Sequence, residues 1–179
     1  MTGAADQDLS RVVASAAAGD EIAFARIVAA YNGEMHRVCT VVARDRTIAE
    51  DAVQAAWLIA WRKLGEVRDP ARVRPWLVSV AVNEARQLMR KRRTRSHVEA
   101  EVDIGIIPGG LDPATQAGAQ DLREALERLD PDDRALLAMR YVAGFNSTEV
   151  AMAIGLTPSG TRNRFERLLA RLRQELSDG

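Results

Sequence analysis

The sequence predicts an all-α protein made of two small helical domains joined by a flexible acidic linker. Three observations support this fold class. Apolar residues recur at spacings of three and four along most of the chain, which is the period of one face of an α-helix. Several of these segments begin at a capping residue and end at glycine. Residues 96–119 interrupt the pattern, because they hold Glu and Asp but no Lys or Arg and contain the breaker Pro108-Gly109-Gly110. 

The composition limits the class of protein. A chain of 179 residues, 47% of them hydrophobic, can hold one medium domain or two small ones. No apolar run approaches the roughly 18 residues of a membrane span, and the N-terminus lacks the pattern of a secretory signal. Cys39 is the only cysteine, which excludes an internal disulfide and fits a reducing cytoplasm. The 25 basic residues balance the 25 acidic ones, whereas a free-standing nucleic-acid binder is more often basic.

The N-terminal domain, expected over residues 1–95, begins with two helices. Leu9 to Ala17 is predicted as a short helix, and Asp20 is a suitable cap for the second. The apolar residues of the second helix keep helical spacing: Phe24, Ile27, Val28, Tyr31, Met35, Val38 and Val42. His36 and Cys39 lie one turn apart, but no other ligand is spaced to complete a metal site. Burial of the cysteine as a small hydrophobic residue is therefore favoured.

A third helix is predicted to begin at Thr47, with Glu50 completing a capping box. Trp57 and Trp61 are four residues apart and are placed to stack along one edge. The small and aliphatic positions expected to face inward are Ile48, Ala52, Ala56, Ile59 and Ala60. The neighbouring, more exposed positions are Asp51, Gln54, Leu58 and Arg62. They are interpreted either as a docking surface or as a solvated face, and chemistry alone favours the solvated face.

The fourth helix is predicted to start at Pro75 and to end in a basic run. Its expected buried face consists of Leu77, Val80, Ala81, Ala85 and Leu88. The basic run consists of Arg90, Lys91, Arg92, Arg93 and Arg95. Such a run is either a solvated helix end or a phosphate-binding surface. Asn83 stands among apolar residues and can donate to and accept from a base edge, although an exposed or capped asparagine is the commoner case.

The C-terminal domain, expected over residues 119–179 after a linker at 96–118, ends in a helix-turn-helix pattern. An earlier helix is predicted to be capped by Asp130, opened by Pro131 and closed by Gly144. The first helix of the helix-turn-helix has several local signals: the capping pair Asn146 and Glu149 at its start, and Gly155 at its end. The second helix is predicted to start at the capping pair Thr157 and Pro158.

The second helix of this pattern has one apolar and one polar face. The predicted buried stripe consists of Phe165, Leu168, Leu169, Leu172 and Leu176. Ser159, Asn163 and Arg167 face away from the stripe, and Arg162 and Arg164 lie on its flanks. A helix with these side chains near its N-terminus can enter a DNA major groove. The alternative is an ordinary helical hairpin with a solvated basic face.

Four segments in this order resemble a bacterial RNA polymerase sigma factor of the extracytoplasmic-function (ECF) class, with the two domains called sigma-two and sigma-four. The segments are AEDAVQAAWLIAWRKL, RPWLVSVAVNEARQLMRKRRTR, LREALERLDPDDRALLAMRYVAGFNSTEVAMAIG and TRNRFERLLARLR. Together they cover nearly all of the chain outside the termini and the linker. The resemblance implies a transcription initiation factor that binds core RNA polymerase and reads the minus-ten and minus-thirty-five promoter elements.

The resemblance also implies roles for particular residues. Those matching the helix that binds the polymerase β′ clamp are Asp51, Gln54, Leu58 and Arg62. Residues 67–72 and the helix after them match the reader of the minus-ten element, in which Asn83 would help to receive a flipped base. The other candidates for DNA binding are Arg86, Arg90, Lys91, Arg92, Arg93, Ser159, Arg162, Asn163, Arg164 and Arg167.

The chain departs from the family pattern at several positions. Ala55 stands where many relatives carry Glu, and Gln87 stands where Asp is usual. Val82 occupies a commonly basic position. Before the reading arginines, Ser159-Gly160-Thr161 replaces the family's Gly-Thr-Val. These differences affect which individual contacts with promoter DNA or polymerase are made and which promoter sequence is recognised. They do not affect the assignment to the ECF class.

The expected partners are core RNA polymerase, through its β′ clamp and β flap, promoter DNA and an anti-sigma protein. The expected location is the cytoplasm, free or held near the membrane by the anti-sigma protein, without insertion into the membrane. No catalytic or metal-binding residue and no cofactor is expected, because no Cys, His and carboxylate cluster has suitable spacing, which disfavours an enzyme. A free-standing helix-turn-helix regulator is the other alternative, and it predicts tight binding to duplex DNA without polymerase. The promoter sequence, the inducing signal and the angle between the domains are left open by the sequence.

Overall fold

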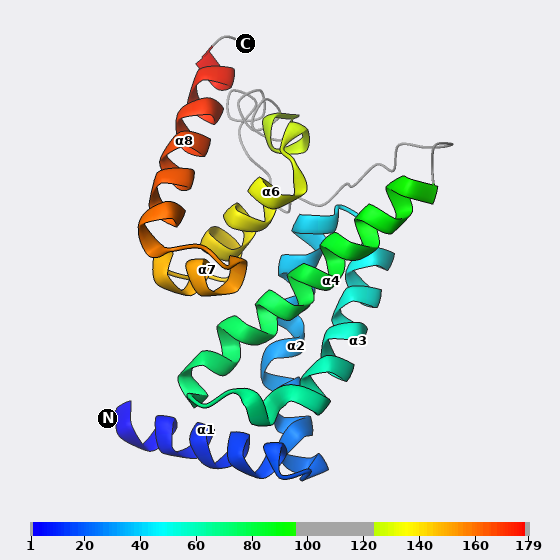
Figure 1. Ribbon diagram of the computed structural model, residues 1–179, viewed down its shortest axis with the longest axis vertical. Helices are drawn as coiled ribbons and strands as arrows, with labels where there is room; N and C mark the ends of the chain where they lie inside the picture. Colours follow the sequence, from blue (N-terminus) through cyan, green and yellow to red (C-terminus); the bar gives the residue numbers. More distant parts are fainter. Residues whose placement is uncertain (1, 96–123, 178–179) are drawn as a thin grey trace, which may run out of the picture.

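The computed structural model describes residues 2–95 and 124–177, and every regular element in these two ranges is helical (Figure 1). The linker predicted at 96–118 lies outside the described residues. The longer elements are α1 (Thr2–Ala17), α2 (Glu21–Ala43), α3 (Arg46–Lys63), α4 (Val73–Arg95), α6 (Pro131–Leu137), α7 (Ser147–Ile154) and α8 (Pro158–Ser177). The shorter ones are the 3-10 turns η1 (Leu64–Glu66) and η2 (Pro70–Arg72) and the π-helix η3 (Ala138–Val142). Residues 124–128 are also helical.

The helices α2, α3 and α4 pack side by side, and α1 crosses one end of them (Figure 1). The helix α3 faces its neighbours with alanines that are fully buried: Ala49, Ala52, Ala56 and Ala60. Because alanine has a short side chain, the neighbouring helices can approach closely along this face. Cys39 lies in the same core, and burial raises the pKa of its thiol to about 12, so the thiol stays protonated and unreactive.

The starts of the N-terminal helices partly follow the prediction. The helix α1 ends at Ala17 as predicted but begins at Thr2 rather than at Leu9. The cap at Asp20 is confirmed, since its carboxylate accepts from the backbone N–H groups of the next helix at 2.9 and 3.0 Å. The predicted start of α3 at Thr47 was wrong. The helix begins one residue earlier, and Asp45 caps it by accepting from the N–H of Ile48 at 3.1 Å. Glu50 does not close a capping box but pairs with Arg46 at 2.8 Å.

Two further predictions for this region are corrected. The helix α4 starts at Val73 rather than Pro75, because the 3-10 turn η2 leads directly into it. The two tryptophans, Trp57 and Trp61, were expected to stack on each other. Instead, both rings meet Phe24 edge-on, with centroids 5.8 and 4.9 Å away, and the indole N–H of Trp57 donates to Asn32 at 2.9 Å. Edge-on pairs of this kind are a favoured geometry for aromatic side chains.

The C-terminal helices follow the local signals closely. Asp130 caps α6, accepting from two backbone N–H groups at 2.8 Å. The capping box of Asn146 and Glu149 is present at α7, and Gly155 ends that helix with a left-handed φ of 71°. Thr157 caps α8 by accepting from the N–H of Gly160 at 3.1 Å. The π-helix η3, which continues α6, was not predicted.

The apolar stripe of α8 is shorter than predicted. Phe165, Leu168 and Leu172 are buried, whereas Leu169 is half-buried and Leu176 in the last turns is 38% exposed. 

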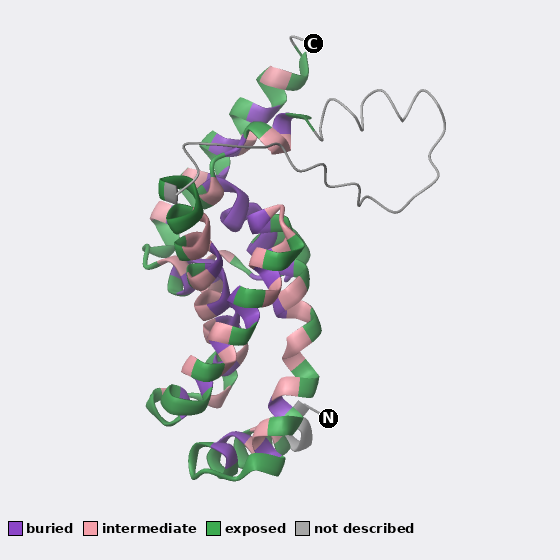
Figure 2. Ribbon diagram, turned by 90° about the vertical axis from the view of Figure 1, so that its right-hand side faces the viewer, coloured by how far each residue is buried: buried purple, intermediate pink, exposed green. Residues whose placement is uncertain are grey.

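The two groups of helices contact each other directly. The helix α4 packs against α7, and α2 packs against α6 and η3 (Figure 1). Buried residues from both groups form one hydrophobic core, and the buried segments face inward between the helices (Figure 2). The sequence left the arrangement of the two domains open, and the structure brings them together.

Candidate nucleic-acid interface

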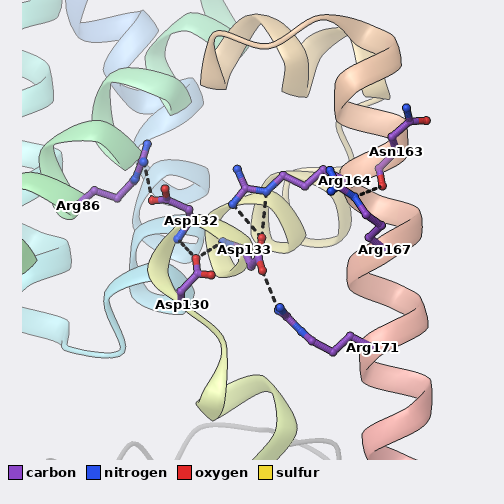
Figure 3. Close-up of polar contacts among 8 residues, drawn as sticks. All are labelled: Arg86, Asp130, Asp132, Asp133, Asn163, Arg164, Arg167 and Arg171. Carbon is purple, nitrogen blue, oxygen red and sulfur yellow. Dashed lines mark hydrogen bonds and ion pairs between the residues drawn. The ribbon is translucent and has the colours of Figure 1, made fainter.

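The helix α8 presents most of its predicted DNA-binding side chains to solvent. Ser159, Arg162, Asn163 and Arg167 are all exposed. Figure 3 shows the side chain of Asn163 pointing away from α6, and Nε of Arg167 donates to the carbonyl of Asn163 at 3.3 Å. Because Phe165 lies on the buried side of the same turns, its packing sets the rotation of the helix that turns these polar groups outward. The N-terminal half of α8 thus forms an exposed polar ridge.

Arg164 differs from its neighbours on α8. Its guanidinium donates twice to Oδ1 of Asp133 on α6, at 3.0 and 2.8 Å (Figure 3). Arg171, two turns later, donates to Oδ2 of the same carboxylate at 2.7 Å. Asp133 is 7% exposed, and this burial alone would raise its pKa; the hydrogen bonds from the two arginines outweigh burial and hold the pKa below its usual value.

Asp133 and Arg171 were not singled out by sequence reasoning. The seven-residue spacing of Arg164 and Arg171 places them on the same side of α8, which is the one signal in the sequence. Nothing local identifies the partner, because Asp133 lies 31 residues before Arg164. A single carboxylate therefore attaches α8 to α6 at two points.

The residues of α4 that were predicted to contact the minus-ten element lie in two different environments. Asn83 is exposed. Arg86 is half-buried, and its guanidinium is 2.5 Å from the carboxylate of Asp132 on α6 (Figure 3). It also donates to the side-chain oxygen of Asn83 at 3.4 Å, while its Nε is buried without a hydrogen-bond partner among the described residues. Arg86 is thus held by the C-terminal helices, whereas Asn83 remains accessible.

The basic end of α4 is exposed at four positions: Arg90, Lys91, Arg92 and Arg93. Arg92 pairs with Asp45, the cap of α3. Burial alone would raise the pKa of Asp45, but the hydrogen bonds from the N–H of Ile48 and from Arg92 lower it overall. The side chain of Arg95 is not among those that the structure describes. This end of α4 therefore presents a cationic surface.

The four predicted polymerase-binding residues share one exposed face of α3. They are Asp51, Gln54, Leu58 and Arg62. Leu58 is 66% exposed, and Nε of Arg62 donates to its carbonyl at 3.0 Å. Trp61, 42% exposed, lies beside this face and lines a shallow apolar depression with Phe24 and Val28. A large aliphatic side chain in the centre of a polar exposed stripe is typical of a docking surface.

Two further features of the described residues concern metal binding and membrane insertion. Within 2–95 and 124–177, no three or more His, Cys, Asp or Glu side chains are placed to hold a metal ion. None of the helices in these ranges is both long and apolar enough to cross a membrane.

Comparison with known families gives two matches. Sigma-70 region 2 matches residues 27–95, and sigma-70 region 4 matches residues 119–172. Both regions come from the same family of proteins, and they occur here in the family's order. The helices α2, α3 and α4 lie largely in the first match, and α6, α7 and most of α8 lie in the second.

Several curated proteins are similar along most of this chain. The probable RNA polymerase sigma factor RfaY of Xanthomonas campestris pv. campestris is 32% identical over 179 residues, which cover 96% of this chain but 44% of that protein. The chain thus spans less than half the length of this relative. RNA polymerase sigma factor CarQ of Myxococcus xanthus is 28% identical, with 89% of this chain and 92% of that protein covered. ECF RNA polymerase sigma factor SigM of Mycobacterium tuberculosis is 29% identical, with coverages of 91% and 82%.

Two solved structures share the fold. CnrH, in complex with the cytosolic domain of CnrY, superposes with a TM-score of 0.67 at 24% identity and covers 93% of this chain and 96% of that chain. RpoE of Bartonella quintana, in complex with the anti-sigma factor NepR, also gives 0.67, at 23% identity, with coverages of 86% and 96%. Both likenesses extend over the N-terminal and C-terminal helices together.

Proposed function

The chain belongs to the sigma-70 family of RNA polymerase sigma factors, in its extracytoplasmic-function class, and on this premise we propose that it directs core RNA polymerase to specific promoters. The observation that carries the proposal is the exposed ridge of α8, which holds Ser, Arg and Asn side chains at the N-terminal end of the second helix of a helix-turn-helix. Catalysis belongs to the polymerase in this scheme, so the protein is not an enzyme and needs no cofactor.

The face of α3 is the proposed docking site for the β′ clamp of the polymerase. Leu58 supplies apolar contact area at its centre, and Asp51, Gln54 and Arg62 supply polar contacts around it. This arrangement, an apolar centre with a polar rim, is how protein interfaces are commonly built. The C-terminal helices are proposed to contact the β flap.

The helix α4 is the proposed reader of the minus-ten element. The exposed amide of Asn83 can donate to and accept from an unstacked base. The cationic end of α4, residues 90–93, is placed to contact backbone phosphates, which would add affinity without sequence information. Arg86 joins this surface only when it is released from Asp132.

The helix α8 is the proposed reader of the minus-thirty-five element. Arg162, Asn163 and Arg167 are exposed and suited to base edges and phosphates in a major groove, and Ser159 lies in the first turn, near the helix N-terminus. Arg164 remains partly exposed, with 32% of its side chain accessible, but its bonds to Asp133 also give it a positioning role. These assignments divide the chain into a sigma-two domain at 1–95, a linker at 96–118 and a sigma-four domain at 119–179.

An anti-sigma protein is the proposed regulator. Support comes from the solved relative RpoE, which is in complex with the anti-sigma factor NepR, and from CnrH, which is in complex with the cytosolic domain of CnrY. The protein would then act in the cytoplasm, and its inactive form would be found wherever the anti-sigma protein is located.

The test of the proposed function is run-off transcription from a promoter library with core RNA polymerase, in the presence and absence of the protein. Discrete transcripts only in its presence are expected, and their start sites give both promoter elements. Tight binding of the protein alone to duplex DNA, without transcripts, would favour the free-standing regulator. Arg167→Ala should reduce transcription from promoters that depend on the minus-thirty-five element. The control is Arg173→Ala, at an exposed position further along α8, which should leave this transcription unchanged.

The role of Asn83 can be tested separately. Asn83→Ala is expected to reduce open-complex formation about tenfold, since a lost base contact costs about 1–3 kcal/mol, while polymerase binding stays near wild type. Permanganate footprinting measures strand opening, and titration with labelled polymerase measures binding. Thr94→Ala, an exposed position at the end of α4 that is outside the predicted contacts, is the control. Equal losses of opening and binding would show that Asn83 has a structural role instead.

A further inference from the structure

One side of α4 carries a stripe of exposed polar side chains. Asn83, Gln87 and Arg90 follow one another at spacings of four and three and therefore share a face of the helix, and all three are exposed. The side chains of Val82 and Ala85, beside this stripe, are 1% and 0% exposed. Because these buried side chains fix the rotation of α4, the polar stripe faces solvent, and Gln87 lies between the proposed base-binding amide and the proposed phosphate-binding end.

Gln87 is held by a second residue of the same helix. Its side-chain Nε2 donates to Oε1 of Glu84, one turn earlier, at 3.4 Å. An ionised carboxylate can only accept hydrogen bonds, so the amide nitrogen of Gln87 has to face Glu84 and the carbonyl oxygen has to face away from it. Since both residues belong to α4, this contact does not depend on how other helices pack.

The contact with Glu84 leaves two groups of the Gln87 amide for a ligand. A glutamine amide has two N–H donors and one acceptor oxygen, so one donor and the oxygen remain, side by side. This pair matches the edge of adenine, which offers N6 as a donor and N7 as an acceptor. Guanine presents two acceptors on the corresponding edge, and cytosine presents a donor without an acceptor. The oriented amide of Gln87 therefore suits adenine best.

The position of Gln87 along α4 indicates which nucleotide it meets. Four residues of an α-helix span about 6 Å along the axis, whereas the two atoms of the adenine edge are within reach of a single amide. Asn83 and Gln87 are therefore placed for neighbouring nucleotides rather than for one base. Beyond Gln87, the exposed cationic residues 90–93 can hold the phosphates of the same strand.

We propose that Gln87 selects an adenine of the minus-ten element, next to the base that Asn83 receives. Glu84 is a positioning residue, which keeps the amide of Gln87 in the orientation that adenine requires. This inference rests on the proposed function of α4 and adds one of the bases that the helix recognises. A carboxylate in place of the Gln87 amide could only accept, so it would favour the N4 donor of cytosine.

The experiment uses the full-length protein with core RNA polymerase and a promoter library in which each position of the minus-ten element carries all four bases. The base frequencies among the transcribed promoters measure recognition at each position. The wild type is expected to prefer adenine at the position that Gln87 reads. Gln87→Leu should lower this preference by about five- to 150-fold, the range of one bidentate base contact. Gln87→Glu should transfer the preference to cytosine and leave the other positions unchanged.

Three further variants separate base recognition from helix stability. Thr94→Ala, at an exposed position near the end of α4, is the control and should keep the adenine preference. Glu84→Gln should weaken the preference about twofold, the strength of such pairs on a helix surface, because a glutamine can both donate and accept and no longer orients the amide. Glu84→Asp keeps the charge and should retain the preference. A purely structural role of Glu84 would instead lower transcription from all library members equally.

A chemical probe tests the same contact from the side of the DNA. In one selected promoter, the adenine is replaced by the analogue that has carbon in place of N7, which still pairs with thymine. Transcription with the wild type should fall, and transcription with Gln87→Leu should not respond.

Two results would overturn the inference: an adenine preference that persists in both Gln87→Leu and Gln87→Glu, or a wild type that prefers adenine at no position of the minus-ten element. Transcripts with unchanged base preferences would thus remove the role of Gln87 and leave the proposed function standing. The absence of transcripts with every protein would refute the proposed function itself, and the role of Gln87 with it.

Discussion

The N-terminal group of helices, α1–α4, and the helix α8 of the C-terminal group are held to their neighbours in different ways. In the first group, long helices bury fully enclosed apolar side chains such as Met35, Val38 and Leu77, all 0% exposed. In the second group, the helix α8 keeps its apolar residues slightly accessible, with Phe165 at 8% and Leu172 at 6%. In addition to this packing, the carboxylate of Asp133 on α6 binds two arginines of α8.

This difference separates helices fixed by apolar packing from a helix, α8, whose orientation also depends on charged contacts. Apolar burial is non-directional and depends little on salt or pH, so α3 and α4 should keep their geometry over a wide range of conditions. Hydrogen-bonded ion pairs fix direction, because the guanidiniums of Arg164 and Arg171 must meet both oxygens of Asp133. Removing a charge at Asp133 should therefore change the orientation of α8. The stability of the N-terminal helices should instead depend on the volume of their buried side chains.

The largest effect is expected from removing volume in the N-terminal core. Leu77→Ala should lower the free energy of unfolding by about 2–5 kcal/mol, because Leu77 is fully buried and leaves a cavity. Leu176→Ala, at a position 38% exposed on α8, should cost less than about 1 kcal/mol. Urea unfolding followed by circular dichroism measures both. Equal losses would contradict the contrast between the two regions.

An intermediate effect is expected from removing the charge of Asp133, which binds two arginines of α8. Asp133→Asn should lower the free energy of unfolding by about 1–3 kcal/mol, less than for a fully buried pair because both arginines are partly exposed. It should also reduce discrimination between promoters with intact and scrambled minus-thirty-five elements. Asp132→Asn, which leaves α8 attached, is the control and should keep that discrimination. Unchanged discrimination in Asp133→Asn would mean that packing alone orients α8.

The smallest expected effect is a change in how the free energy of unfolding depends on pH. The pKa of Asp133 is lowered in the folded protein, so the folded state binds fewer protons than the unfolded state at acidic pH. The stabilisation is complete above the unfolded pKa, about 3.9, and is lost as the pH falls through the folded pKa. Asp133→Asn should therefore lose less stability than the wild type between about pH 6 and pH 3. Denaturant unfolding at each pH measures this, and parallel curves for the two proteins would contradict it.

Much of the helical framework could be predicted from the sequence because its signals are local. The caps at Asp130 and Asn146, the stop at Gly155 and the start at Pro158 depend on hydrogen bonds between residues two to five positions apart, and all were confirmed. Two of the misplaced starts, at α3 and α4, lie where a competing acidic cap, Asp45 or Asp69, precedes the predicted one.

The candidate site was predictable to the extent that helix period alone decides which side chains face outward. The period placed Ser159, Asn163 and Arg167 on the exposed side of α8, and each is exposed. It could not show that Val78 and Val82 of α4 are buried as well, because their burial depends on which helices pack around α4.

The sequence by itself determined where helices begin and end and which faces carry charge, since these depend on neighbours within one or two turns. Only the tertiary structure decided which charges meet. Arg134 reaches the carbonyl of Val42 across 92 residues of sequence, and Asp133 gathers Arg164 and Arg171 from a different helix. Such contacts depend on how whole helices pack, and the hydrophobic core that brings them together is shared by both regions.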